Sequence, residues 1–274
     1  MANEFTALTE DEEKSPLAKY FYREKARPNP RIMEILSKGP MDPAKALPIE
    51  RFDDLLDPGY HEVENGYCIL DDGTGYICAN NVFPNCTVDM IKWWFAWHCL
   101  EDIRYKIWDP VKHGAISVSD AGRKKVLDPN IPIEEKYADI VHCVVEDVGG
   151  GYEDIEINFK TPAGMGFNEE KLKKSPVKAI FGGFGISENR EHRGNKIPAI
   201  MMHTCREKDG GAEFRTRFYM GCRLDNGVPV CALPQGARVP IEAPMGLAFH
   251  SVEEYSNLAV LLPDVYKEFG PGIS

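Results

Sequence analysis

The second half of the chain alternates apolar and polar residues with a period of two, and this feature limits the possible folds most. Strands are predicted at 140–148, 152–160, 177–185, 198–206, 214–224 and 228–232. Short links such as Gly149–Gly151 favour antiparallel neighbours, because parallel strands need a long crossover. Over residues 250–269 the period becomes helical, and Pro263 is expected to kink or split that helix. The pattern therefore predicts a curved antiparallel sheet closed over a C-terminal helix.

The first half of the chain predicts an arm and a hairpin. Residues 1–57 combine an acidic tail with short helical stretches that prolines interrupt, so we interpret them as an N-terminal tail and helical arm. Residues 58–274 then form the main domain. Within it, two short apolar runs at 66–70 and 76–79 flank a glycine-containing loop and predict a hairpin.

A long aromatic helix is predicted over residues 88–108. Thr87 can cap its first turn, and Asp109-Pro110 ends it. The aromatic residues of this segment cover more surface than one core-facing side requires. The helix therefore either lies buried at the centre of the fold, or part of it contacts an aromatic ligand or a partner subunit.

Charge and cysteine usage exclude several classes of protein. The chain has 32 Lys and Arg against 43 Asp and Glu, a net charge of −11, which disfavours binding to nucleic acid. No apolar run approaches the ~20 residues that a membrane span needs. The acidic N-terminal segment does not resemble a secretory signal, so a cytoplasmic protein with reduced thiols is expected. None of the eight cysteines forms a C-x-x-C pair, so most are predicted to be buried apolar residues.

Histidines and carboxylates provide the candidates for chemistry. His250 and Glu254 are one helical turn apart and share a face, although a structural pair is the more common reason for that spacing. In the strand at 140–148, alternation places His142 and Glu146 on one face, where a carboxylate needs a partner unless the strand lies at an edge in water. His113 follows the turn that ends the aromatic helix. Together these residue types favour a His/Glu metal site.

Other candidates are less specific. His203 lies among apolar neighbours in a predicted strand and is either a core residue or a general acid or base. Arg217 and Tyr219 share one face of the next strand. His98 and Asp102 are interpreted as a structural pair, and whether His98 or His142 reaches a pocket stays open. The chain has no phosphate-binding glycine loop and no G-x-S-x-G nucleophile motif.

Four separated motifs between residues 60 and 270 carry a family resemblance. They are Trp93-Trp-Phe-Ala-Trp97, Tyr105-x-x-Trp-x-Pro-x-x-His113, Val145-Glu146-x-x-Gly149-Gly150 and His250-x-x-x-Glu254. In this order they resemble the diacetylphloroglucinol hydrolase family. The resemblance implies an α+β, Bet v 1-like helix-grip fold, with a curved antiparallel sheet around a long C-terminal helix. It also implies a small helical N-terminal part used in dimerisation, so a homodimer is expected.

The resemblance implies an activity and a set of site residues as well. The family hydrolyses the C–C bond between an acyl carbonyl and a phloroglucinol ring, so the expected substrate is a small aromatic ketone. Phloretin, cleaved to phloroglucinol and 3-(4-hydroxyphenyl)propionate, is the first choice. No counterpart of the family's pocket asparagine follows His113, because Ala115, Ile116 and Ser117 occupy that region. The expected ligands of one zinc ion per subunit are His113, Glu146, His250 and Glu254; the expected catalytic residues are Tyr105 and His203; the expected substrate-binding residues are Arg217, Tyr219 and Trp97.

Two other classes of function remain open at this point. Two histidines and a carboxylate also suit ferrous iron, so an aromatic-ring dioxygenase with a non-haem metal is an alternative. A metal-free carrier is the other alternative, because a sheet closed over a helix can hold a small apolar molecule without acting on it. The second carboxylate favours zinc and the hydrolase.

Overall fold

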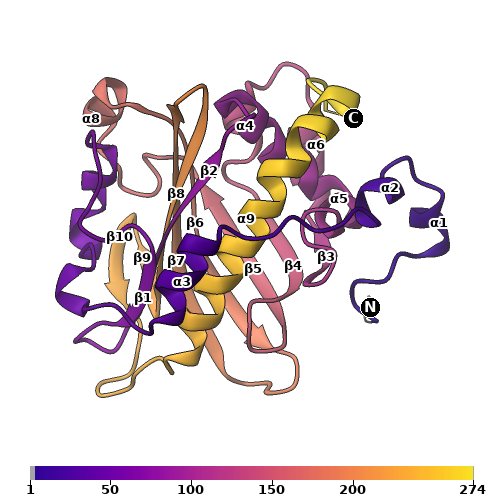
Figure 1. Ribbon diagram of the computed structural model, residues 1–274. Coiled ribbons are helices and arrows are strands. Elements are labelled where there is room, and N and C mark those ends of the chain that lie inside the picture. Colours follow the sequence, from indigo (N-terminus) through magenta and orange to yellow (C-terminus); the bar gives the residue numbers. More distant parts are fainter. Residues whose placement is uncertain (1–3, 274) are drawn as a thin grey trace.

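A computed structural model describes residues 4–273, within which eight strands form one antiparallel sheet with a long helix lying across it (Figure 1). The strand order is β1-β2-β8-β7-β6-β5-β4-β3. The last strand of the sheet in the sequence, β8, therefore pairs with β2 from the first half of the chain. The predicted α+β architecture, an antiparallel sheet packed on a C-terminal helix, is confirmed. The strands of this sheet are β1 (Gly66–Ile69), β2 (Gly75–Phe83), β3 (His113–Ser117), β4 (Val141–Asp147), β5 (Tyr152–Lys160), β6 (Val177–Asn189), β7 (Lys196–Lys208) and β8 (Gly211–Met220).

The C-terminal helix α9 (Glu242–Phe269) is longer than predicted and is not split at Pro263. A proline cannot donate a hydrogen bond to the carbonyl four residues earlier, which here belongs to Ala259. The thiol of Cys86 donates to that carbonyl instead, with Sγ 3.7 Å from the oxygen. The freed carbonyl is thus satisfied from outside the helix, and the predicted split does not occur.

The aromatic helix predicted over 88–108 is interrupted. Helix α4 (Val88–Trp97) passes into a short 3-10 turn, η3 (His98–Leu100), and Glu101 is then extended with φ −150° and ψ 142°. Helix α5 (Asp102–Lys106) follows. The Asp102 carboxylate accepts a hydrogen bond from the amide of Ile116 at 2.7 Å, which ties the interruption to β3.

The aromatic surface of α4 is covered by the chain itself. Trp93, Trp94 and Trp97 are all buried. Trp93 packs edge-on against Tyr266 near the end of α9, and Trp97 packs against Phe269. For these three tryptophans the structure supports burial at the centre of the fold, and contact of another part of the surface with a ligand stays a prediction.

The strand predicted at 214–224 is in fact two strands. It breaks at Gly221, whose φ of +89° is favourable for glycine and strained for other residues. Beyond the break, β9 (Cys222–Asp225) pairs with β10 (Val228–Cys231) as a separate two-stranded ribbon. The prediction of one continuous strand was therefore wrong.

The N-terminal arm packs along the body of the protein. Helix α3 (Pro30–Ser37) lies against α9, and η2 (Ile49–Leu56) packs on the face of the sheet opposite α9 (Figure 1). As a result both faces of the sheet are buried over much of their area. The remaining helices are α1 (Glu10–Glu13), α2 (Ala18–Phe21), η1 (Pro43–Lys45), α6 (Asp120–Leu127), α7 (Ile133–Lys136) and α8 (Glu169–Lys174).

Two further expectations concern the whole chain. Among residues 4–273, no helix combines the length and the apolar character that crossing a membrane would require. All eight cysteines are free thiols, and only Cys143 and Cys231 are exposed. The prediction that most cysteines are buried apolar residues is confirmed.

Candidate metal centre and cavity

A cavity lies between the inner face of the sheet and α9, and most of its wall is apolar. Its side chains are fully buried at one end, around Phe95 and Phe159, and only half-buried at the other, around Ile197 and Leu247. An apolar cavity with a few convergent polar groups is typical of a small-molecule site. The polar residues that line it are His98, Tyr105, His142, Glu146, Glu153, Ser187, His203, His250, Glu254 and Tyr255.

Three of the four predicted metal ligands form one buried group, of which His250 and Glu254 line the cavity. The ligand atoms of His113, His250 and Glu254 all lie within 4.8 Å of one another. His113 is the first residue of β3, while His250 and Glu254 are one turn apart on α9 as predicted. Glu146 of β4 lies beside the group, with its Oε2 3.3 Å from His113 Nε2 and 3.8 Å from His250 Nε2.

Two glycines allow α9 to come this close to β4. A Cβ atom added to Gly149, in the turn after β4, would lie 2.5 Å from the Cα of Gly246 on α9. Gly149 also has a φ of +110°, which glycine tolerates best. The backbones of the two elements therefore touch one turn before His250, and this contact brings the helix ligands against Glu146.

The tautomer of His113 indicates a cation. Its Nδ1 lies 3.2 Å from the carbonyl oxygen of Tyr105, so Nδ1 carries the proton and Nε2 presents a lone pair. That Nε2 is buried and has no hydrogen-bond partner among the described residues, although carboxylate oxygens of Glu146 and Glu254 lie 3.3 and 3.6 Å away. Lone pairs that converge without a proton between them fit a shared metal ion. The donor set of nitrogen and carboxylate oxygen suits zinc and other divalent transition metals.

His113 and Glu146 titrate as metal ligands would, whereas the pKa values of Glu254 and of His250 beside the two carboxylates are raised. Burial lowers the pKa of His113 to about 4, so the ring is neutral, as a ligand must be. Burial alone would raise the pKa of Glu146, but its contacts with His250, His113 and Tyr105 lower it to about 2. Burial raises the pKa of Glu254 to about 8 against the attraction of His250. A bound cation would favour the ionised form of both carboxylates.

Tyr105 lies beside the candidate metal ligands and also lines the cavity. Its ring stacks on that of His113, with centroids 4.0 Å apart, and its hydroxyl donates a hydrogen bond to Glu146. Burial raises the pKa of Tyr105 well above its usual value, and the charge of Glu146 raises it further. Tyr105 therefore keeps its proton at neutral pH and is held in place by the carboxylate beside the metal ligands.

His203 belongs to the same cavity and is neutral. Its Nδ1 lies 2.9 Å from Thr216 Oγ1, and its Nε2 lies 3.4 Å from the hydroxyl of Tyr255 on α9. Burial lowers the pKa of His203 to about 3 and raises that of Tyr255 well above its usual value. Tyr255 was not predicted as a site residue, because its position fits the apolar pattern of the helix. Its place directly after Glu254 was the available signal.

His98 and His142, whose position the sequence left open, both line the cavity. The rings of the two residues meet edge to face, with centroids 5.4 Å apart. His98 Nδ1 lies 2.8 Å from the carbonyl oxygen of Trp94. The structural pair predicted for His98 and Asp102 does not form, because the interruption at Glu101 turns Asp102 to the amide of Ile116.

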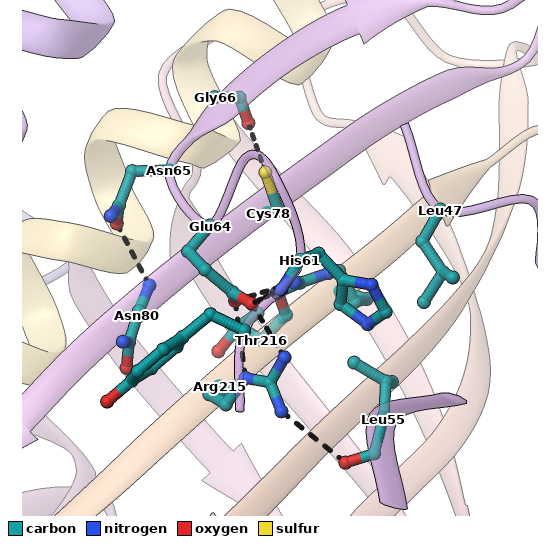
Figure 2. Close-up of polar contacts among 12 residues, drawn as sticks. Leu47, Leu55, His61, Glu64, Asn65, Gly66, Cys78, Asn80, Arg215 and Thr216 are labelled. Atoms are coloured by element: carbon teal, nitrogen blue, oxygen red, sulfur yellow. Dashed lines mark hydrogen bonds and ion pairs between the residues drawn. The ribbon is translucent and has the colours of Figure 1, made fainter. Parts of the chain in front are cut away.

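The three residues expected to bind substrate lie elsewhere. Arg217 and Tyr219 do share a face of β8, but it is the outer face, where Arg217 pairs with Glu64 at 2.7 Å and Tyr219 donates to the Leu47 carbonyl. Figure 2 shows Glu64 and Arg215 in the same cluster. Trp97 lies against the end of α9, outside the cavity lining. None of the three therefore enters the site that we propose below. The cavity side of β8 presents Phe218 and Met220 instead.

Behind the metal ligands, the N-terminal arm supports the site. Trp108 Nε1 donates to the carbonyl of Glu254 at 3.1 Å, which fixes α9 against the segment after α5. Lys25 of the arm lies 2.6 Å from the fully buried carboxylate of Asp109. The amide of Ala26 donates to Asn257 at 2.9 Å. The arm is thus joined to both elements that carry the ligands.

Comparison with known proteins assigns the family. The family model described as the DAPG hydrolase PhiG domain matches residues 47–267. Phloretin hydrolase of Eubacterium ramulus is 34% identical over 264 residues, covering 95% of this chain and 93% of that protein. A 2,4-diacetylphloroglucinol hydrolase of Pseudomonas sp is 29% identical over 268 residues, covering 93% of this chain and 88% of that protein. Among solved structures, the crystal structure of Ara h 8.0201 has a TM-score of 0.40 at 10% identity and covers 70% of this chain and 99% of that one. The chain belongs to the DAPG hydrolase PhiG family of acylphloroglucinol C–C hydrolases.

Proposed function

We propose that this protein is a zinc-dependent hydrolase that cleaves phloretin to phloroglucinol and 3-(4-hydroxyphenyl)propionate. The observation that carries the proposal is the buried group of His113, His250 and Glu254, the last two of which line an apolar cavity. Family membership supplies the reaction class, and the 34% identity to a phloretin hydrolase favours phloretin over diacetylphloroglucinol.

His113, His250 and Glu254 would hold the zinc ion, with Glu146 as a fourth ligand or as a partner that orients the other groups. A zinc ion held there would act as a Lewis acid and make water a nucleophile at neutral pH. The chain's own contribution is a dry, preorganised site: all four side chains are buried, and the Tyr105 carbonyl holds His113 in the tautomer that a metal needs.

The reaction needs a proton on a ring carbon. A trihydroxylated ring can accept a proton on the acyl-bearing carbon and become a keto tautomer. Water then adds to the acyl carbonyl, the bond between the acyl and ring carbons breaks, and its electron pair returns to the ring as an enolate. The acyl carbon gains OH and the ring carbon gains H, so the products are a carboxylic acid and phloroglucinol.

Tyr105 is the proposed proton donor to the ring carbon. It keeps its proton at neutral pH and lies against His113 at the metal end of the cavity. His203 is neutral, so its proposed role is to orient Tyr255 or a substrate hydroxyl. General acid catalysis by a positioned side chain typically contributes ~10²–10⁴-fold in rate.

The test measures the metal content of the purified protein and its rates of hydrolysis of phloretin and of 2,4-diacetylphloroglucinol, with and without oxygen. The proposal predicts stoichiometric zinc and equal rates with and without oxygen. It also predicts a higher kcat/KM for phloretin. A requirement for oxygen would indicate a dioxygenase, binding without turnover would indicate a carrier, and a preference for diacetylphloroglucinol would overturn the choice of substrate.

A further inference from the structure

His142 is a cavity residue whose polar atoms have no partner. Its side chain is 1% exposed and lines the cavity between the sheet and α9. Its Nε2 is buried without a hydrogen bond, and neither ring nitrogen has a hydrogen-bond partner among residues 4–273. Leaving such a group unsatisfied typically costs about 1–3 kcal/mol. A buried histidine of this kind calls for a ligand atom.

The surroundings of His142 cannot supply that atom. Its ring packs against the ring of Phe159, with centroids 4.6 Å apart, and against His98. Nδ1 of His98 is already engaged with the Trp94 carbonyl. Burial lowers the pKa of His142 well below its usual value, so the ring is neutral and offers one donor and one acceptor.

His142 lies at the closed end of the cavity, beyond the metal ligands. It shares a face of β4 with Glu146, four residues away, a spacing of about 13 Å along a strand. The rings of His113, Tyr105, His98 and His142 follow one another from the metal ligands to this end. A ligand whose carbonyl lies at the metal ligands therefore reaches His142 with its far side.

We propose that His142 binds the phloroglucinol hydroxyl opposite the acyl group, and so makes a third ring hydroxyl a requirement for tight binding. This inference rests on the proposed function, because it takes the acylphloroglucinol as the ligand. The fully buried end of the cavity suits the ring, and the half-buried end suits acyl chains of different length. A neutral imidazole accepts a hydrogen bond from the phenol and can donate one when that oxygen becomes a carbonyl in the keto tautomer. A flip of the ring brings either nitrogen to the ligand.

The experiment compares two ligands that differ by this single hydroxyl: 2,4,6-trihydroxyacetophenone and 2,6-dihydroxyacetophenone. Their dissociation constants are measured by tryptophan fluorescence, since Trp108 lines the cavity, and by calorimetry. In the unchanged protein the trihydroxy ligand should bind about 10-fold more tightly, as expected for one net hydrogen bond. In His142→Phe that preference should disappear, while the affinity for the dihydroxy ligand is retained.

Val144→Ala is the matched control, because Val144 shares the strand face and the cavity wall but has no hydrogen-bonding group. It should change the affinity for both ligands alike and keep the preference. His142→Ala, which removes the ring without adding bulk, replaces His142→Phe if circular dichroism shows that variant to be misfolded. A preference that survives loss of the imidazole, or that is missing from the unchanged protein, overturns the inference.

The binding comparison is independent of turnover. If phloretin is not hydrolysed but the preference is present and is lost in His142→Phe, the proposed function fails and the hydroxyl contact stands. If phloretin is hydrolysed and His142→Phe keeps the preference, the function stands and the contact fails.

Discussion

At the scale of single residues, the metal centre depends on which nitrogen of His113 carries the proton. The Tyr105 carbonyl accepts a hydrogen bond from Nδ1–H of His113, so Nε2 can only accept, and it faces two carboxylates. A lone pair that faces carboxylate oxygens is unfavourable unless a proton or a metal cation joins them. This one backbone contact therefore leaves a buried histidine with a lone pair that a metal ion could accept.

The ligand assignment predicts graded losses of metal. His250→Ala and Glu254→Ala should each lose bound zinc and activity, because each removes a member of the group whose ligand atoms lie within 4.8 Å. Glu146→Gln should weaken zinc binding ~10–100-fold without abolishing it, as expected for a partner that orients ligands. Metal content after dialysis and circular dichroism provide the measurement and the folding control. Full zinc occupancy in either of the first two variants would remove that residue from the site.

Proton delivery can be separated from metal binding. Tyr105→Phe should keep zinc and bind substrate but lose ~10²–10⁴-fold in turnover, since only the hydroxyl is removed. His203→Ala should lose rate with metal retained, because Tyr255 and the substrate lose their neighbour. In D₂O one deuteron should enter the ring carbon that carried the acyl group, with product exchange measured separately. If Tyr105→Phe turns over at the normal rate, another group is the acid.

At the scale of elements, the arm is joined to the outer face of the sheet by a buried charge cluster. Glu64 accepts from Arg215 at 2.6 Å (Figure 2) and from Arg217 at 2.7 Å. Both arginine side chains are fully buried. Arg215 also donates to the Leu55 carbonyl of η2 at 3.4 Å. Arg215 thus connects β8 with both η2 and the segment that carries Glu64.

Loss of that carboxylate should destabilise the fold in a pH-dependent way. Glu64→Gln leaves two buried guanidinium groups without a counter-ion, so the free energy of unfolding should fall by about 3–5 kcal/mol. Burial opposes ionisation of Glu64, but Arg217 and Arg215 lower its pKa from 4.5 to about 2. The folded-state pKa is depressed, so this stabilisation is fully present above pH 4.5 and is lost as the pH falls toward 2.

The measurement is denaturant unfolding of both proteins between pH 3 and pH 7. The difference between them should be constant above pH 4.5 and shrink below it. Glu62→Gln is the control. Glu62 pairs with Lys45 at 2.6 Å, a similar distance, but this pair lies on the surface, where water screens its charges. If Glu62→Gln lowers the free energy of unfolding as much as Glu64→Gln does, the effect is not specific to the buried cluster.

At the scale of the whole molecule, the number of subunits stays a prediction. The family resemblance predicts a homodimer, but the aromatic surface that also suggested a partner is covered within the chain by α9. Sedimentation at micromolar concentration should give twice the chain mass of 30.8 kDa. A mass near 30.8 kDa would contradict the prediction. Truncation of the arm before α3 should then show whether the arm makes the contact.

The sequence by itself determined which residues share a face. The period of two placed His142 with Glu146 and Arg217 with Tyr219, and the helical period placed His250 with Glu254; each pairing holds in the structure. These patterns are local, because the side-chain directions follow from the backbone of one element. The antiparallel character of the sheet and the closing helix followed from the same periods and from short links.

Only the tertiary structure decided which face of each element meets the cavity. An alternating pattern does not tell which of the two faces of a strand points to the cavity. Because the arm buries the outer face of the sheet, both faces carry apolar residues, and hydrophobicity does not distinguish the outer face from the inner one. Arg217 and Tyr219 therefore lie on the far side, and Tyr255, which read as an apolar helix position, lies in the site. The break at Glu101 and the lone imidazole of His142 depend on contacts between distant segments, which no local period encodes.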